Sequence, residues 1–206
     1  MCLVIHKPRN VDLPVALLDS AADYNPHGYG LMAFSDDGVL QVVRSAQTRK
    51  SALLGQYREF RDHECVIHLR YGTSGAVDAP NTHPIEITPQ LYVAHNGTVN
   101  LERHVPERSD TWHLVNDYLR PILSRRPELL YDTFFQELMT TWCGPHNKFV
   151  FMDGAQKRTV IVNRQSGFDV EGLWLSNTRW FDASRFSWRQ ASASPEPTGP
   201  RLLFSI

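Results

Sequence analysis

The length, composition and charge of the chain limit the kind of protein that it can be. Its 206 residues are 42% hydrophobic and 21% charged, which is typical of a globular protein. Lysine and arginine (21) balance aspartate and glutamate (22), and without a basic block we expect no direct binding of nucleic acid or of an anionic membrane. No apolar run approaches the roughly 18 residues of a membrane span, and no signal peptide opens the chain. The three cysteines are widely spaced and indicate reduced thiols, so we expect a cytoplasmic protein with one domain, residues 1–206.

The apolar pattern along the chain predicts short strands at both ends and helices between them. Strands are expected at 3–6, 30–34, 39–43, 65–69, 91–94, 149–152, 159–162, 173–175 and 202–204, with a loop at 191–200. Helices are expected at 49–61, 110–123 and 128–141, and the second of them places Trp112, Val115, Leu119 and Ile122 on one face. This order of elements indicates an α+β domain with layered sheets.

Cys2 is the first candidate catalytic residue, because removal of Met1 would make it the N-terminus. A terminal cysteine carries a nucleophilic thiol together with an α-amino group, whose ordinary pKa of about 7.7–8.0 suits a general base. On its own, a cysteine at this position is also compatible with the start of a buried strand.

Polar segments follow Cys2 at the ends of predicted strands and at the start of a predicted helix. They are Asn25-Pro26-His27-Gly28-Tyr29-Gly30, His68-Leu69-Arg70-Tyr71-Gly72-Thr73-Ser74-Gly75, Asn81-Thr82-His83-Pro84, His95-Asn96-Gly97 and Ser109-Asp110-Thr111. In this order, and together with Cys2, they resemble the glutaminase domain of class II glutamine amidotransferases, which are N-terminal-nucleophile hydrolases. The resemblance runs from Cys2 to about Leu123. It implies a four-layer αββα sandwich with two antiparallel sheets.

The resemblance also implies a role for each matching residue. Cys2 would attack the side-chain amide of glutamine, release ammonia and form a thioester, while the amide of Asn96 and the backbone N–H of Gly97 stabilise the oxyanion. Arg70 can offer a planar fork to the substrate carboxylate, Asp110 can pair with the ammonium group, and Thr73 would also bind substrate. Full-length members join this domain to a synthase. This chain is expected to be too short to contain one, so the acceptor synthase would be separate or absent, and we expect no cofactor.

Simpler interpretations stay open for each of these residues. Arg70 could form a surface ion pair, Asn96-Gly97 could be a hairpin turn, and Asp110 could be a helix cap. His83 is expected to shape its loop without a catalytic role. His27 and Trp112 stand where relatives often have acidic residues, which affects substrate contacts but not the nucleophile.

Two other functions also remain possible. One is a stand-alone hydrolase of the same fold that cleaves a γ-glutamyl or small amide bond, and the other is a catalytically silent binding module. The nine histidines show no paired metal-ligand spacing, Cys143-Gly144-Pro145-His146 is too isolated for zinc, and no Walker-type loop occurs. We therefore predict no metal site.

Overall fold

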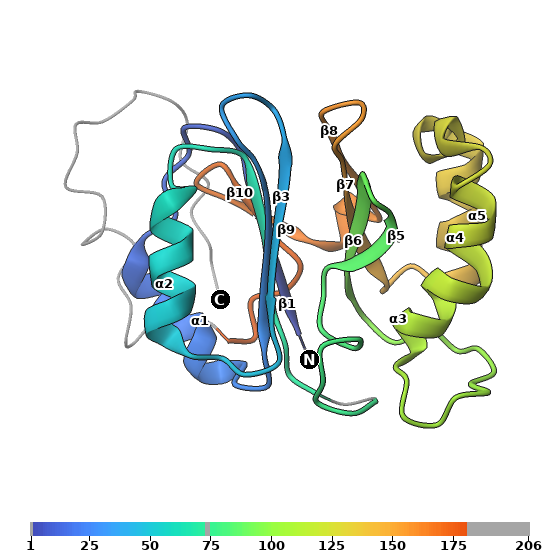
Figure 1. Cartoon of the computed structure of the whole chain (residues 1–206), viewed down its shortest axis with the longest axis horizontal. Coiled ribbons are helices and arrows are strands. Elements are labelled where there is room, and N and C mark those ends of the chain that lie inside the picture. The colour runs from blue at the N-terminus through green and yellow to red at the C-terminus, as the bar shows by residue number, and fades with distance from the viewer. Residues whose placement is uncertain (1, 73–74, 181–206) are drawn as a thin grey trace.

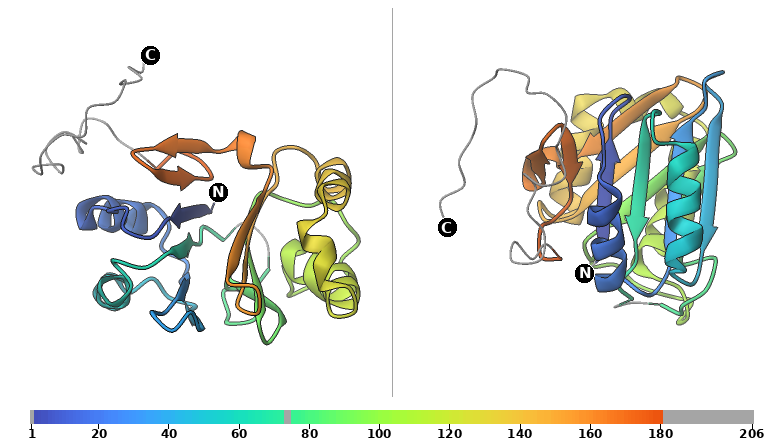
Figure 2. Two further views of the ribbon diagram at one scale, coloured as in Figure 1. Left: turned by 90° about the horizontal axis from the view of Figure 1, so that it is seen from above. Right: turned by 90° about the vertical axis from the view of Figure 1, so that its left-hand side faces the viewer.

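The computed structural model of the chain describes residues 2–72 and 75–180, and these residues form two antiparallel sheets between two layers of helices (Figures 1 and 2). Thr73, the strand expected at 202–204 and the loop expected at 191–200 lie outside the described residues. Within the described ranges, none of the helices combines the length and apolar content needed to cross a bilayer.

The first sheet is covered on its outer face by two helices. It contains β1 (Leu3–Lys7), β2 (Tyr29–Phe34), β3 (Leu40–Ser45), β4 (Cys65–Leu69), β9 (Phe168–Val170) and β10 (Leu173–Leu175), in the order β3-β2-β4-β1-β10-β9. The helices are α1 (Val15–Tyr24) and α2 (Lys50–Glu59). Apolar side chains of both helices, including Leu17 and Leu53, pack with sheet residues such as Ile5 and Ile67 in one buried cluster.

The second sheet is covered by the remaining helices. It contains β5 (Ile85–Thr88), β6 (Leu91–Asn96), β7 (Lys148–Asp153) and β8 (Arg158–Val162) in that order. The helical layer is built from α3 (Asp110–His113), the π-helix η1 (Leu114–Leu119), α4 (Arg120–Leu123), the 3-10 helix η2 (Pro127–Tyr131) and α5 (Thr133–Cys143), and the short 3-10 helix η3 (Arg164–Ser166) follows β8. Val93, Leu114 and Phe149 belong to the cluster that joins this sheet to its helices.

A third apolar cluster lies between the two sheets. Its members come from the inward faces of both sheets: Val4, Met32, Phe34, Val66, Ala94, Val150, Met152 and Trp174. The strands β2, β4 and β7 are buried along their whole length, which explains why most of their residues are apolar. The four-layer arrangement with two antiparallel sheets, which the resemblance implied, is therefore confirmed.

Four elements of the described residues were not predicted from the sequence, and one predicted helix is divided. The unpredicted elements are α1, β5, η3 and β9. The helix expected at 128–141 is interrupted at Asp132, whose side chain accepts a hydrogen bond from the backbone N–H of Phe135 at 3.1 Å and so caps α5. The segment before this cap is the 3-10 helix η2.

The helix expected at 110–123 forms, but its buried face differs from the prediction. Val115 and Leu119 are buried and Trp112 packs partly against them, whereas Ile122 is exposed and Leu123 is buried in its place. The π-helical stretch η1 contains more residues per turn than an α-helix, so it rotates the residues that follow it.

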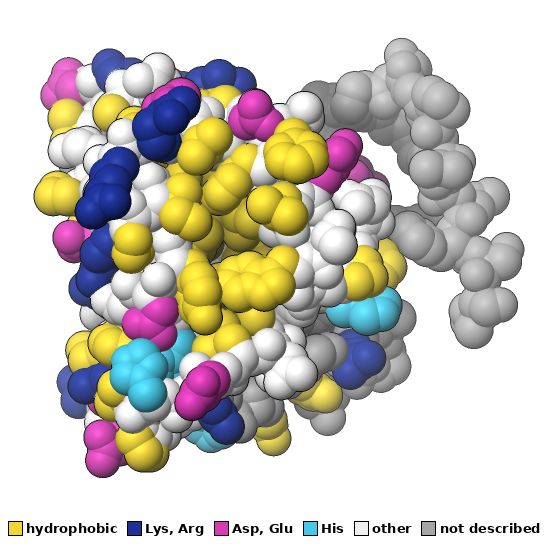
Figure 3. All heavy atoms as spheres, turned by 90° about the vertical axis from the view of Figure 1, so that its right-hand side faces the viewer, with side chains coloured by type: hydrophobic (Ala, Val, Ile, Leu, Met, Phe, Trp, Pro, Cys, Tyr) yellow, Lys and Arg dark blue, Asp and Glu magenta, His cyan; other side chains and the backbone are white. Residues whose placement is uncertain are grey.

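The outer face of this helical layer is apolar. Its large exposed side chains are Tyr118, Ile122, Phe134, Leu138 and Trp142, and Figure 3 shows hydrophobic side chains gathered across this face. The rings of Tyr118 and Trp142 lie 4.7 Å apart and connect η1 to α5.

Candidate active site

Strand register brings the sequence motifs to one edge of the sandwich. Leu69 at the end of β4 is paired with Leu3 at the start of β1 and with Tyr29 at the start of β2. Since neighbouring strands are antiparallel, Cys2 and Arg70 extend from the same edge of the first sheet. The second sheet contributes Asn96, which lies at the end of β6. The side-chain amide of Asn96 donates to the backbone carbonyl of Cys2.

Cys2 is held by contacts from both sheets. Its Sγ lies 3.5 Å from the carbonyl oxygen of Tyr71, and its own carbonyl accepts a second hydrogen bond from Nδ2 of Asn177 at 2.8 Å. Burial raises the pKa of the Cys2 thiol, and the positive charge of Arg70 opposes that rise without overcoming it. The thiol therefore keeps its proton near neutral pH and needs a base before it can act as a nucleophile.

Asn96 and Gly97 lie at the end of β6, next to Cys2. Gly97 has a φ of +152°, and a Cβ at this position would lie 2.2 Å from Oδ1 of Asn147 and 3.0 Å from its Cα. Only glycine fits this backbone beside the buried Asn147. The hairpin interpretation is wrong, because β6 pairs with β7, which begins only at Lys148.

Arg70 is buried rather than on the surface, which excludes the surface ion pair as its role. Only 3% of the residue is exposed, and its Nη2 donates to the carbonyl of Gly75 at 3.4 Å. Burial lowers the pKa of the guanidinium, which the nearby Cys2 and Asp78 partly offset. The backbone is fixed by a 2.8 Å hydrogen bond from the Arg70 N–H to the carbonyl of Gly28.

Asp110 is the first residue of α3, but it does not cap the helix. Ser109 is the cap, because its side chain accepts from the backbone N–H of Trp112 at 3.1 Å. The Oδ2 atom of Asp110 instead accepts from the backbone N–H of Val99 at 2.7 Å. The buried carboxylate therefore holds the loop that follows Gly97, close to the end of β6.

Asn81 joins the segment after Arg70 to the start of α3. This connecting role was not predicted from the sequence. Its Oδ1 accepts from the N–H of Ser109 at 2.8 Å, and its Nδ2 donates to the carbonyls of Glu107 at 2.9 Å and Ala76 at 3.1 Å. Asn177 is a second missed residue. Its contact with Cys2 spans 175 positions of sequence, so no local pattern could reveal it.

Three histidines are buried near the ends of β4 and β6, and His95 faces the helical layer, where its ring stacks on Phe149. Nδ1 of His83 lies 2.8 Å from Nε2 of His68, and His95 contacts Oγ1 of Thr111 at 2.7 Å and Oδ1 of Asn147 at 2.8 Å. Burial lowers the pKa of all three rings, to about 3 for His68. They are therefore neutral near pH 7.

Comparison with known proteins identifies the class of protein that this fold and site define. The family model of the class-II glutamine amidotransferases matches residues 13–140, so the chain belongs to this family. The chain is 27% identical over 168 residues to a candidate glutamine amidotransferase of Haemophilus influenzae, which covers 78% of this chain and 52% of that protein.

A solved structure also matches the chain. It is the glutamine phosphoribosylpyrophosphate amidotransferase from B. subtilis complexed with ADP and GMP, with 13% identity and a TM-score of 0.48 over 88% of this chain and 43% of that chain. The chain therefore spans about half the length of the proteins that it matches. The matched region is therefore a domain of the class-II glutamine amidotransferase family.

Proposed function

We propose that the chain releases ammonia from glutamine through a thioester on Cys2, after removal of Met1. The observation that carries this proposal is the contact between the Asn96 amide and the carbonyl of Cys2, which unites a thiol and an oxyanion donor from different sheets. An NH₂ group has two donors, so Asn96 can hold Cys2 with one N–H and face the substrate with the other.

The reaction follows from these groups. The α-amino group of Cys2 accepts the thiol proton, and the thiolate attacks the side-chain carbonyl carbon of glutamine. Negative charge moves to the carbonyl oxygen, where the Asn96 amide and the Gly97 N–H receive it. The ammonium group formed at Cys2 returns the proton to the amide nitrogen, the carbon–nitrogen bond breaks, and ammonia leaves. Water then cleaves the thioester, giving glutamate and the free thiol.

The raised pKa of Cys2 supports a need for this internal base. A thiol that stays protonated near neutral pH is a weak nucleophile until a nearby group removes its proton. The α-amino group of the same residue has an ordinary pKa close to neutral and needs no other side chain to position it.

Arg70 and Asp110 are the proposed contacts for the ends of the substrate that do not react. Arg70 would receive the α-carboxylate and Asp110 the α-ammonium group, with Thr73 as a further contact. Burial of both charged residues supports these roles, because a charge in a partly dry site interacts strongly with an opposite charge on a ligand.

We propose further that the ammonia passes to an acceptor synthase in the cytoplasm. Ammonia released into neutral water is mostly protonated and no longer nucleophilic, so direct transfer would keep it reactive. Family membership supports such coupling.

The deciding experiment combines intact mass with labelling by a glutamine analogue that carries an electrophilic diazoketone. The purified chain should lack Met1, gain one label at Cys2 and hydrolyse glutamine, and Cys2→Ala should lose both label and turnover. Cys65→Ala is the matched control, because burial raises the pKa of the Cys65 thiol to about 12 and keeps it unreactive. Labelling that persists in Cys2→Ala would refute the mechanism.

Two further results would favour the other functions. Hydrolysis of other γ-glutamyl amides but not of glutamine would indicate the stand-alone hydrolase. No hydrolysis of any such amide by the chain without Met1, with its native partner added back, would indicate a silent module.

A further inference from the structure

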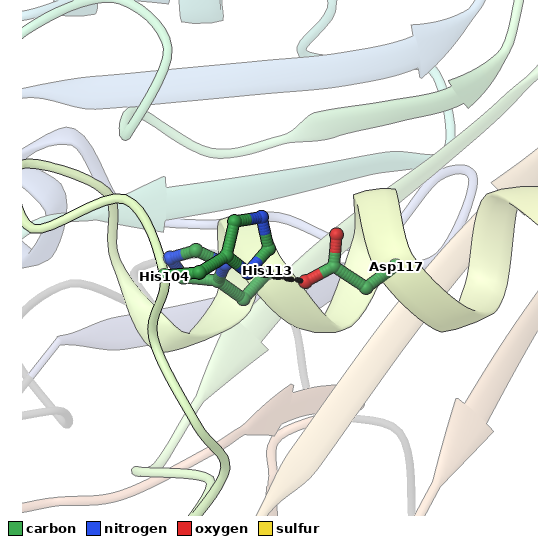
Figure 4. Close-up of side chains that lie close together, drawn as sticks. All are labelled: His104, His113 and Asp117. Carbon is green, nitrogen blue, oxygen red and sulfur yellow. Dashed lines mark hydrogen bonds and ion pairs between the residues drawn. The ribbon is translucent and has the colours of Figure 1, made fainter.

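Two histidines and an aspartate of the helical layer, none of which the proposed reaction uses, lie close together. His113 is in α3, Asp117 lies one turn later in η1, and His104 comes from the loop before α3. Figure 4 shows the three side chains close together, with the carboxylate of Asp117 directed toward the ring of His113. Each residue offers one potential ligand atom, and these atoms all lie within 4.8 Å of one another.

The contacts of His113 point to a cation beside its ring. Its Nε2 lies 3.2 Å from the carbonyl oxygen of Val105, and its Nδ1 lies 3.2 Å from Oδ2 of Asp117. Both neighbours are acceptors, whereas a neutral imidazole has a single N–H to donate. If Nε2 donates to Val105, the lone pair of Nδ1 faces a carboxylate oxygen, which is unfavourable unless a positive charge, either a second ring proton or a metal ion, lies between them.

The hydrogen bond from Nε2 of His113 to the carbonyl of Val105 is of the kind that orients metal-binding histidines. Such a histidine usually donates its second ring N–H to a backbone carbonyl or carboxylate, which fixes the tautomer and directs the other nitrogen to the metal. The His113 side chain is fully buried, so its orientation is fixed by packing as well. Its ring lies 4.6 Å from that of His104 and 5.1 Å from that of Trp112.

The two distances from the Asp117 carboxylate suit a small tetrahedral ion. With metal–ligand bonds of about 2.0–2.1 Å, neighbouring ligands in a tetrahedral zinc site lie roughly 3.3–3.4 Å apart. Oδ2 of Asp117 lies 3.2 Å from Nδ1 of His113 and 3.6 Å from Nδ1 of His104. The His104 side chain is 59% exposed and that of Asp117 30%, so water can reach a fourth position.

From this geometry we propose that His104, His113 and Asp117 form a zinc site with water as the fourth ligand. Two imidazoles and one carboxylate are a ligand set that Zn²⁺ accepts. The ion would join the loop that carries His104 to the helix that follows it. Asp110 lies one turn before His113 and already binds that loop through Val99, so zinc would make this side of the candidate active site more rigid.

Zinc binding can be measured directly on the whole chain by competition with a chromophoric chelator and by isothermal titration. We expect one Zn²⁺ per chain. Asp117→Asn keeps the shape of the side chain, and His104→Gln changes an exposed residue, so both variants should fold. Each should weaken binding by at least about tenfold, since loss of an outer-shell partner alone typically costs 10–100-fold. His146→Gln is the matched control at an exposed histidine elsewhere and should bind like the wild type.

Cobalt substitution identifies the ligands. Co²⁺ bound by nitrogen and oxygen in a tetrahedral site gives visible ligand-field bands without the sulfur-to-metal charge-transfer bands of cysteine ligands. Added zinc should also slow hydrogen exchange in the loop 98–108 of the wild type but not of Asp117→Asn. The proposal is overturned if no stoichiometric binding occurs, if the bands show sulfur ligation, or if both variants bind as the wild type does. In those cases His113 and Asp117 form an ion pair without metal.

Discussion

Acidification should destabilise the fold through the buried His68, and the size of the effect follows from its surroundings. His68 is 1% exposed and shares the inward face of β4 with Val66. Burial lowers its pKa from the ordinary 6.5 to about 3, and the positive charge of Arg70 acts in the same direction. Below pH 6.5 the unfolded chain therefore takes up a proton at this residue, whereas the folded chain does not until about pH 3.

Proton linkage gives the sign and the magnitude of the change in the free energy of unfolding with pH. The unfolded state binds more protons in this window, so the free energy of unfolding falls as the pH falls. With a folded pKa of about 3, His68 alone should lower the free energy of unfolding by about 2 kcal/mol between pH 7 and pH 5. His83 and His95 act in the same direction, because burial lowers their pKa values as well.

The assay is urea unfolding followed by tryptophan fluorescence at pH 7, 6 and 5. His68→Leu removes the titrating ring, so its loss of stability between pH 7 and pH 5 should be about 2 kcal/mol smaller than that of the wild type, whatever the stability of the variant at pH 7. His146→Gln, at an exposed position, should keep the wild-type pH dependence. Parallel curves for the wild type and His68→Leu would show that His68 is not held neutral by burial.

Other predictions concern the candidate active site. Asn96→Ala should lower kcat by about 10²–10³ with little change in KM, because its amide acts on charge that exists only in the transition state; a change confined to KM would contradict the oxyanion role. Asp110→Asn should mainly raise KM, by about 10–100-fold, because hydrogen bonds to charged groups contribute about 1.5–3 kcal/mol. Steady-state kinetics distinguishes the loss of kcat in Asn96→Ala from the rise of KM in Asp110→Asn. Asn177→Leu should lower kcat by releasing the carbonyl of Cys2, and unchanged kinetics would exclude this positioning role. Gly97→Ala should lower the thermal midpoint of unfolding, because the added Cβ meets a buried amide at 2.2 Å; a midpoint equal to that of the wild type would show that the backbone adapts.

Strands could be predicted from the sequence where a short apolar run indicates that the strand is buried. An apolar run such as that of β2 or of the middle of β7 needs little context, because a strand buried on both faces is mostly apolar. The helix α1 also carries a local signal that went unused, since Leu17, Leu18, Ala21 and Ala22 recur at helical spacing. The strand β9 carries none. It has three residues, mostly exposed, and exists because it pairs with β10.

The helix that begins at Asp110 shows where periodicity fails. Trp112, Val115, Leu119 and Ile122 follow the spacing of a regular helix, so the pattern predicted that all of them face the core. The π-helical turns change the angle between successive residues, and Leu123 replaces Ile122 in the core. Sequence periodicity assumes one helix geometry and cannot register such a local change.

The sequence by itself determined the order of the polar motifs and the class of chemistry that they suggest, because each motif lies within a few residues at the end of an element. Only the tertiary structure decided how the motifs meet. Register across antiparallel strands placed Cys2 beside Arg70, and packing of the two sheets brought Asn96 to its carbonyl. The tertiary structure also placed Asn177 against the carbonyl of Cys2 and brought His104 next to His113. Hydrogen bonds and ligand sets depend on distances of a few ångströms between residues far apart in the chain, which no local pattern encodes.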